Sequence, residues 1–301
     1  MTVIDFIGDI HGYSDKLEEL LLKLGYSNFR KGFRHPSRKA FFVGDYIDRG
    51  PNNPRVVEIV RAMVDAGDAT ALCGNHEHNA ICYNTKVDDG YLRKHTAKNR
   101  KQHAATLDQF KGNQRQYDEA IAWFKTLPLY FETDQFRAVH ATWNYEAIAY
   151  LKRETENGIL SDHHFQEFQD ENSTLFKSVE MTCKGEEAEL PNNESFLDKD
   201  GNERHHIRIK WWLDPTKFNL KELSILEDIK ISKNKKLEKV NPFYGENEVP
   251  VFFGHYWLKG EPNLYRNNIC CLDYSVAKKG FLCAYRFNGE SRLENSNLVY
   301  V

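Results

Sequence analysis

The sequence lacks the long apolar segments by which proteins cross a lipid bilayer. A membrane-spanning helix needs about 20 consecutive apolar residues, and no run in these 301 residues approaches that length. Hydrophobic residues make up 41% of the chain and charged residues 28%, which allows a core but argues against a protein buried in lipid. We therefore expect no membrane partner.

A strong excess of charge of one sign is also missing. The 41 lysine and arginine residues nearly balance the 44 acidic residues, which leaves a net charge of −3. Proteins that hold nucleic acid without sequence preference present a basic surface, so we expect no generic nucleic-acid binding. We find neither an internal repeat nor a low-complexity tract, and we expect one domain over residues 1–301. The oligomeric state does not follow from the sequence.

Cysteine pairs at metal-binding or redox spacing are absent too. No Cys-x-x-Cys motif joins the six cysteines, Cys73, Cys82, Cys183, Cys270, Cys271 and Cys283. We expect reduced, buried thiols, as in cytoplasmic proteins. Cleavage of a secretory signal would remove about the first 15–30 residues. Asp9 and His11, which belong to the site described below, would be lost with them, so we expect a cytoplasmic protein.

Strand-like and helix-like segments alternate in the first 140 residues. Apolar runs at residues 3–7, 40–43 and 69–73 predict strands. Leucines at i, i+3, i+4 and i+7 from Leu17 predict a helix after the first strand, and a second helix is expected at residues 54–66. This order implies right-handed crossovers and a largely parallel sheet.

The rest of the chain predicts a hairpin, an insertion and a return to strands. The hairpin is expected at residues 129–133 and 136–141, and strand-like runs return from residue 249. The intervening stretch is poor in periodic apolar residues. We interpret residues 144–210 as an inserted, cap-like segment near the mouth of the active site.

Five segments share one design, an apolar strand followed by a turn that bears metal-ligand side chains. They are residues 5–12, 41–50, 71–77, 136–140 and 251–255. Binding crevices in α/β sheets lie at the carboxyl ends of strands, so all five turns are expected to meet in one crevice. Glycines in the turns let the backbone approach a phosphate or a metal closely.

The side chains in these turns are carboxylates, imidazoles and one amide, which suit hard or borderline divalent metals. Two metals about 3.5–4 Å apart can clamp the oxygens of a phosphoryl group and lower the pKa of a bound water to about 7. Asp45 is the natural bridge between them. Each segment alone has a structural explanation, such as a core histidine for His140 or a capping role for Asn75. The five together, each after a strand, favour a metal site.

With these motifs the chain resembles the calcineurin-like metallophosphoesterases, and specifically their phosphoprotein-phosphatase branch. The resemblance covers residues 5–77, His140 and the portion from residue 249. The fold that we expect is α/β, a central β-sandwich of mixed sheets flanked by helices. The resemblance implies two divalent metal ions; we expect manganese, with iron or zinc as alternatives. The implied ligands are Asp9, His11 and Asp45 for the first metal, and Asp45, Asn75, His140 and His255 for the second.

The same resemblance assigns roles to residues beside the ligands. His76 is similar to the general acid of the family, Asp48 to the carboxylate that orients it, and Arg49 to the clamp on the phosphate oxygens. Asn75 is expected to contact substrate as well as metal. For a second phosphate-binding cation, Arg204, Arg208 and Lys210 are the nearby candidates. A basic strand edge that faces water is the equal alternative for these residues.

One departure separates branches of the superfamily. Nuclease and phosphodiesterase members usually have Gly-His-x-His in the last motif, whereas this chain has Gly254-His255-Tyr256-Trp257. The single histidine favours a phosphatase over a nuclease. Trp143, three residues after His140, has two interpretations: a core aromatic, or a residue that narrows the pocket or stacks on a base.

Three functions follow, two of them enzymatic. We expect a dinuclear phosphatase that hydrolyses a phosphomonoester of protein or small-molecule origin by attack of metal-bound hydroxide. Residues 252–286 are similar to symmetrical diadenosine tetraphosphatases, which makes a dinucleoside tetraphosphate hydrolase the alternative. A non-catalytic metal-binding scaffold is the third. Such scaffolds typically lose the acid or the clamp, and here His76, Asp48 and Arg49 are all present.

Overall fold

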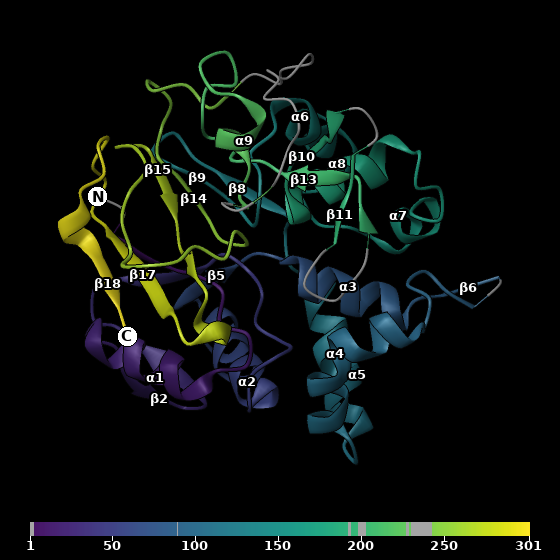
Figure 1. Cartoon of the computed structure of the whole chain (residues 1–301). Helices are drawn as coiled ribbons and strands as arrows, with labels where there is room; N and C mark the ends of the chain where they lie inside the picture. The colour runs from purple at the N-terminus through teal and green to yellow at the C-terminus, as the bar shows by residue number, and fades with distance from the viewer. Residues whose placement is uncertain (1–2, 89, 192–193, 198–202, 227–228, 230–242) are drawn as a thin grey trace.

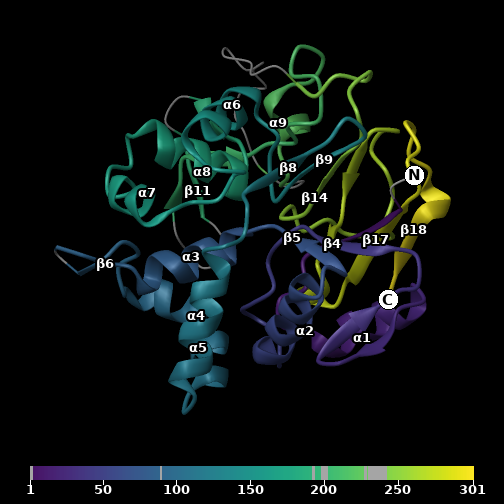
Figure 2. The ribbon, with the colours of Figure 1, turned by 180° about the vertical axis from the view of Figure 1, so that it is seen from behind.

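The computed structural model describes residues 3–88, 90–191, 194–197, 203–226, 229 and 243–301. Within them, two mixed β-sheets pack face to face and helices lie outside, as Figures 1 and 2 show from opposite sides. The α/β fold with mixed sheets and flanking helices that the sequence predicts is confirmed.

The larger sheet has six strands. They are β1 (Ile4–Ile7), β4 (Lys39–Phe42), β5 (Ala69–Ala71), β16 (Asp273–Tyr274), β17 (Phe281–Phe287) and β18 (Leu298–Tyr300). Their order is β16–β17–β1–β4–β5, and β18 pairs with β17. The first three strands of the chain in this sheet, β1, β4 and β5, run parallel as predicted, whereas β17 runs antiparallel to β1.

The smaller sheet has four strands. They are β8 (Tyr130–Glu132), β9 (Arg137–Val139), β14 (Val251–Phe253) and β15 (Ile269–Cys271), in the order β15–β14–β9–β8. β8 and β9 form the expected hairpin, and β14 runs parallel to both β9 and β15. The carboxyl ends of β9 and β14 therefore lie at the same edge.

Helices cover the outside of the sandwich. They are α1 (Ser14–Lys23), α2 (Asn53–Asp65), α3 (Asn75–Asn84), α4 (Ala97–Phe110), α5 (Gln114–Phe124), α6 (Tyr145–Glu154), α7 (Asp162–Glu167), α8 (Thr174–Lys184) and α9 (Leu220–Leu223), with short 3₁₀ helices η2 (Val276–Lys278) and η3 (Asn295–Asn297). α1 packs against β17 and α2 against β5. α3 contacts both α5 and α8, so it joins the sandwich to the helices around the insertion.

Short two-stranded ribbons complete the described structure. They are β2 (Ser27–Phe29) with β3 (Gly32–Arg34), β6 (Lys86–Val87) with β7 (Gly90–Tyr91), β10 (Glu187–Glu189) with β13 (His206–Arg208), and β11 (Phe196–Leu197) with β12 (Glu203–Arg204). The last two ribbons lie in the region of the chain that precedes α9.

Local sequence explains where α2 begins. The side chain of Asn52 accepts a hydrogen bond from the backbone N–H of Arg55, and Pro54 lies in the first turn, where its missing N–H costs nothing. Val57 and Val60 are buried against the sheet, in keeping with the expected apolar face. The observed bounds differ from the predicted ones by a single residue at each end.

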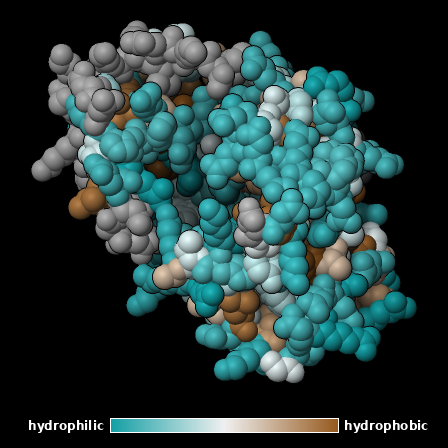
Figure 3. Space-filling model, turned by 90° about the vertical axis from the view of Figure 1, so that its right-hand side faces the viewer, coloured by the Kyte–Doolittle hydropathy of each residue, from teal (hydrophilic) through white to brown (hydrophobic). Residues whose placement is uncertain are grey.

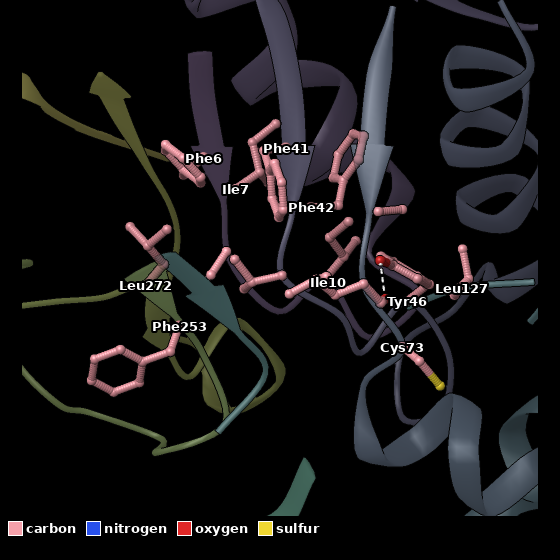
Figure 4. Close-up of a cluster of buried hydrophobic side chains, with 14 of the residues drawn as sticks. Phe6, Ile7, Ile10, Phe41, Phe42, Tyr46, Cys73, Leu127, Phe253 and Leu272 are labelled. Carbon is pink, nitrogen blue, oxygen red and sulfur yellow. Dashed lines mark hydrogen bonds between the residues drawn. The ribbon is translucent and has the colours of Figure 1, made fainter. Parts of the chain in front are cut away.

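Phenylalanine rings fill the space between the two sheets. Phe6 of β1 stacks on Phe252 of β14 with 3.7 Å between ring centroids, and Phe136 meets Phe6 edge-on at 5.0 Å. Aromatic pairs of this kind contribute about 0.5–1.5 kcal/mol each beyond the area they bury. Figure 4 shows part of this core, where the Tyr46 hydroxyl donates to the carbonyl oxygen of Leu72 at 2.6 Å. This packing holds the carboxyl ends of both sheets in fixed positions.

The region around the ribbons has a small apolar cluster of its own. Its buried members are Ala188, Leu190, Ile207, Ile209, Leu220, Leu223 and Ile229. In Figures 1 and 2 this region lies across from α3 and α4.

All six cysteines are buried and form no disulfide, as expected. Across the part of the chain that the structure describes, no helix has the length and apolar character needed to cross a membrane.

Candidate metal centre

The five ligand-bearing turns meet at one edge of the sandwich. Three follow parallel strands of the larger sheet: Asp9 comes after β1, Asp45 after β4 and Asn75 after β5. His140 follows β9 and His255 follows β14 in the smaller sheet. The convergence that the sequence predicts is therefore present in the structure, and it draws on both sheets.

Asp45 lies at the centre of the cluster. Its Oδ2 is 3.6 Å from Nε2 of His11, and its Oδ1 is 3.4 Å from Nε2 of His140. Potential ligand atoms of Asp45, His140 and His255 lie within 4.8 Å of one another, and so do those of Asp45, His11 and His76. The side chain of Asp45 is 1% exposed. Two groups of ligand atoms thus share one buried carboxylate.

Asn75 completes one of these groups. Its Oδ1 lies 3.1 Å from Nε2 of His140 and 2.6 Å from Nδ1 of His255. An amide oxygen that faces two imidazoles is a suitable ligand for a divalent cation held between them.

Several buried polar atoms in the cluster have no hydrogen-bond partner. They are Oδ1 of Asp9, Nε2 of His11 and Nε2 of His255. An unpaired buried polar atom costs about 1–3 kcal/mol. Two of these atoms, Oδ1 of Asp9 and Nε2 of His11, belong to the expected ligands of one metal, whereas His255 faces Asn75 through its other nitrogen. A divalent cation would satisfy the atoms of Asp9 and His11, so the residues fit a metal centre.

Backbone carbonyls fix the orientation of two of the imidazoles. Nδ1 of His11 lies 3.0 Å from the carbonyl oxygen of Ile47, and Nδ1 of His140 lies 2.9 Å from that of Val43. A carbonyl oxygen only accepts, so both Nδ1 atoms must donate. The lone pair then resides on Nε2, which faces Asp45, as is usual for histidines that bind metals.

Acidic side chains gather at the centre, and among the described residues no lysine or arginine forms an ion pair with Asp9 or Asp45. Burial, with Asp273 and Asp45 nearby, raises the pKa of Asp9 well above its usual range. Burial opposes the ionisation of Asp45 as well, but His140 and the other histidines outweigh it and hold the pKa of Asp45 well below its usual range. Burial also lowers the pKa of His11 to about 3 and keeps that ring neutral. An ionised carboxylate beside a neutral imidazole is an environment that suits a cation.

His76 differs from the other histidines because it is paired with a second carboxylate. Its Nδ1 is 2.6 Å from Oδ2 of Asp48, while its Nε2 is 4.0 Å from Asp45. Burial opposes a charge on this ring, but Asp45 and Asp48 outweigh it and raise the pKa of His76. Proximity alone would group His76 with the ligands. Its bond to Asp48 instead suits a proton donor held in one orientation.

Two residues of α4 hold Asp48 in place, and the sequence did not single out either. Nδ1 of His103 lies 2.8 Å from Oδ1 of Asp48, and the Thr106 hydroxyl donates to the same oxygen at 2.5 Å. The backbone N–H of Asp48 donates in turn to Thr106. No motif surrounds these residues, and only the fold brings α4 to the turn after β4.

Glu77 holds the turn after β4 in place through hydrogen bonds to its backbone. Its carboxylate accepts from the backbone N–H groups of Asp45 (2.8 Å), Tyr46 (2.8 Å) and Gly74 (3.0 Å). Burial and the neighbouring Asp45 raise the pKa of Glu77 to about 7. It touches the backbone of the residues that carry the cluster and contributes no atom to the cluster itself.

Site residues adopt backbone conformations that L-amino acids rarely take. The φ angles of His11 (49°), Asp45 (56°), Asp48 (69°), Arg49 (69°) and His255 (72°) are all positive. Such conformations persist only where the surrounding structure enforces them, and they concentrate at functional sites. Gly44 is required beside them, since its φ is 114° and a Cβ there would meet His140 Nδ1 at 2.7 Å.

A cleft of about 2030 Å³ opens in front of the cluster. Arg49, Asn75, His76 and His255 line its floor, and Arg204 and Arg208 line its side, so all the expected substrate-binding residues face one space. Arg208 is half-buried and lies 3.8 Å from Glu187, and its Nε has no hydrogen-bond partner. Figure 3 shows that hydrophilic residues dominate the face that carries α7, which packs beside the cleft-lining helix α8.

Trp143 does not reach this cleft. It is 3% exposed and packs against Tyr130, and the guanidinium of Arg137 lies 5.1 Å from its ring. Of the two interpretations, the core aromatic is correct.

Known proteins with similar sequences are nucleotide hydrolases. The chain is 34% identical over 165 residues to the asymmetrical bis(5'-nucleosyl)-tetraphosphatase PrpE of Halalkalibacterium halodurans, covering 52% of this chain and 63% of that protein. It is 25% identical over 293 residues to the symmetrical bis(5'-nucleosyl)-tetraphosphatase of Buchnera aphidicola, covering 93% of each. For PrpE of Oceanobacillus iheyensis the match is 45% over 74 residues and spans only 30% of that protein. The chain thus matches less than two thirds of the length of both PrpE proteins.

Solved structures agree on the fold. A protein serine/threonine phosphatase from Saccharomyces cerevisiae has a TM-score of 0.51 over 100% of this chain and 79% of that one, at 14% identity. At such low identity the likeness shows the shared fold alone.

A sequence model of calcineurin-like phosphoesterases matches residues 2–255, which is most of the chain. On this match, and with the two-sheet fold and the shared carboxylate already described, the chain belongs to the calcineurin-like phosphoesterase family, whose members use divalent metal ions.

Proposed function

We propose that this protein is a dinuclear metal-dependent phosphatase that hydrolyses phosphomonoesters. The observation that carries the proposal is the position of Asp45, whose two oxygens face separate groups of ligand atoms. One carboxylate between two groups is the arrangement that a pair of cations needs.

In this proposal Asp9, His11 and Asp45 hold one cation, and Asp45, Asn75, His140 and His255 hold the other. Two divalent cations bound there would neutralise phosphate charge and lower the pKa of a water to about 7. Manganese is the proposed metal, with iron or zinc as alternatives, since the nitrogen and oxygen ligands admit all three.

The residues of the chain supply positioning and proton transfer. Arg49 and Arg208 would hold the oxygens of the scissile phosphate, and Arg204 would lie farther along the cleft. His76 would give its proton to the leaving oxygen, because Asp48 holds the ring by Nδ1 and leaves Nε2 turned toward the cluster. Asp48 is itself fixed by His103 and Thr106, so the proton donor would not have to find its orientation in each turnover.

A second candidate function is hydrolysis of dinucleoside tetraphosphates. The similarity to the Buchnera enzyme, which extends over 93% of both chains, favours it. The cleft supports it as well, since Lys98 and Lys101 of α4, and Arg93 before that helix, are basic residues that line it.

We further propose one domain over residues 1–301, with residues 144–210 as a cap at the mouth. Lys177 and Lys184 of α8, together with Arg204 and Arg208, bring this segment to the wall of the cleft. A cytoplasmic location is proposed too, supported by six buried thiols that form no disulfide.

The test is a substrate panel with manganese and with chelator. It contains p-nitrophenyl phosphate, a phosphoserine peptide, a phosphodiester and diadenosine tetraphosphate. Phosphate release from the monoesters supports the first function. ADP as the sole nucleotide product supports symmetrical cleavage, whereas AMP with ATP indicates asymmetrical cleavage. If the manganese-loaded protein hydrolyses no substrate in the panel, both enzymatic functions are excluded and the non-catalytic metal-binding scaffold remains.

A further inference from the structure

The side chain of Arg49 has an unusual environment for a phosphate clamp. Its guanidinium carbon lies 4.7 Å from the centroid of the Trp257 ring. Within the described part of the chain, no carboxylate or carbonyl oxygen accepts a hydrogen bond from it. Its N–H groups therefore remain available to an anion, while the flat face of the group is held by the indole.

A second cation lies over the same ring. Nζ of Lys278 is 3.7 Å from the Trp257 centroid. The guanidinium of Arg49 and the ammonium group of Lys278 therefore lie close to each other, because both contact the same ring. Both residues line the cleft together with Trp257.

The two loops that carry Trp257 and Lys278 are tied to each other. Oδ2 of Asp273 accepts from the backbone N–H of Trp257 (2.8 Å), and Oδ1 accepts from that of Ser275 (2.9 Å), the residue that precedes η2. Trp257 and Ser275 both have positive φ angles, 49° and 62°. A buried carboxylate thus fixes the spacing between the indole and the lysine-bearing 3₁₀ helix.

Arg49 and Lys278 contact the same indole ring and both line the cleft, so an anion with more than one phosphate can meet both cations. A single phosphate is already matched by Arg49 and the proposed metal centre. Lys278 is therefore placed to meet a second phosphate that is joined to the first.

We propose that Trp257 and Lys278 form a second phosphate subsite beside the scissile position. Trp257 is a positioning residue that holds Arg49, and Lys278 binds the phosphate next to the one that is cleaved. The subsite then strengthens the binding of phosphoanhydrides, which carry adjacent phosphates and are the substrates in the second candidate function. This inference rests on the proposed function, because Arg49 is its reference point.

Lys278→Met tests the subsite, with Lys279→Met as the matched control. Lys279 is the exposed neighbour and does not line the cleft. We expect Lys278→Met to raise KM for diadenosine tetraphosphate by about tenfold and to leave KM for p-nitrophenyl phosphate within about twofold. Tenfold corresponds to about 1.4 kcal/mol, in the range of one charge-assisted hydrogen bond. Equal effects on both substrates, or none, overturn the proposal.

A binding measurement separates this proposal from the proposed function. Imidodiphosphate, in which nitrogen replaces the bridging oxygen, and orthophosphate are titrated by calorimetry into manganese-loaded protein. Lys278→Met should weaken imidodiphosphate about tenfold and orthophosphate less than twofold. If this difference appears while no ester is hydrolysed, the subsite stands and the proposed function fails. If hydrolysis occurs without the difference, the subsite is wrong.

The role of Trp257 is tested by comparing Trp257→Phe with Trp257→Leu. Phenylalanine keeps an aromatic face for Arg49 and leucine does not. We expect Trp257→Leu to raise KM for both p-nitrophenyl phosphate and diadenosine tetraphosphate by about fivefold to tenfold, with kcat less affected, and Trp257→Phe to restore most of the loss. Equal behaviour of the two variants, at equal thermal stability, excludes positioning through the ring.

Discussion

His76 lies between two carboxylates, with Nε2 toward Asp45 and Nδ1 on Asp48, and it is the proton donor in the proposed function. We expect His76→Ala to lower kcat on an alkyl phosphate by about 10²–10⁴, the usual contribution of a positioned acid. The loss on p-nitrophenyl phosphate should be much smaller, because its leaving group needs little protonation. His163→Ala, at an exposed histidine of α7, is the control. An equal loss on both substrates would argue that His76 binds metal instead.

His103 acts one step farther from the cluster. It donates to Asp48 through Nδ1, and its Nε2 lies 2.8 Å from the Tyr117 hydroxyl. We expect His103→Ala to lower kcat by about 10–100-fold, as is typical when a supporting hydrogen bond is lost at a metal site, with little change in KM. The variant His103→Gln can still donate a hydrogen bond to Asp48, so it should recover part of the lost kcat. An unchanged kcat in steady-state assays would show that Thr106 alone is sufficient to hold Asp48.

The site residues that belong to a recognisable sequence motif could be predicted from the sequence. Each predicted ligand follows an apolar strand within a few residues, so strand order alone places it at the right edge. His103, Thr106 and Asp273 were not predictable in this way. These residues are separated from their hydrogen-bond partners by 16 to 58 positions in the sequence, so no local pattern predicts the contacts.

At the scale of secondary structure, α3 joins the site to the helices around the insertion. His78, on its buried side, packs against Phe168 beside α7 with 4.7 Å between ring centroids. Burial, helped by Lys184 and Arg93, lowers the pKa of His78 to about 3. The unfolded chain binds a proton on this residue near pH 6.5 and the folded chain does not. The stability that neutral His78 provides is therefore complete above pH 6.5 and is lost as the pH falls toward 3.

We expect the His78→Phe variant to lose stability less steeply on acidification than the native chain. The difference in slope should approach about 1.4 kcal/mol per pH unit between pH 6 and 4. Urea unfolding at several pH values, with chelator throughout, measures it, and any constant offset between the variants is irrelevant. His163→Ala should leave the slope unaltered. Parallel curves for His78→Phe and the native chain would mean that His78 titrates normally in the fold.

Elements with strong local signals were predicted to within one or two residues, and others were missed. α2 has a capping asparagine, a proline in its first turn and a periodic apolar face, and its expected bounds were nearly right. α8 was not recognised, although Leu175, Val179 and Cys183 repeat at intervals of four residues and are buried. The polar residues between these positions weaken the apolar periodicity in the sequence. The buried face of α8 becomes evident only in the structure, where the helix packs against α6 and α3.

At the scale of the whole molecule, the proposed metal ligands come from both sheets: Asp9, Asp45 and Asn75 follow strands of the larger sheet, and His140 and His255 follow strands of the smaller one. Cations held by residues from both would stabilise the folded state and not the unfolded one. At a manganese concentration about 100-fold above its Kd we expect the free energy of unfolding to rise by about 2.7 kcal/mol. Calorimetry should show a higher melting temperature for the native chain and for the exposed-site control Asp65→Asn, and a much smaller rise for Asp45→Asn. A rise of the same size in Asp45→Asn would place the cations elsewhere.

The pairing of β1 with β17 has a consequence for biosynthesis. β1 is formed from residues near the start of the chain, yet one of its two neighbours is Phe281–Phe287. His255 also comes late, after the whole cap-like segment. A ribosome-bound chain that has emerged only as far as β9 would contain Asp9, His11, Asp45 and Asn75 without the strand that closes the larger sheet. Catalytic competence should consequently arise in a single step once Phe281–Phe287 has emerged from the ribosome, with no partially active precursor.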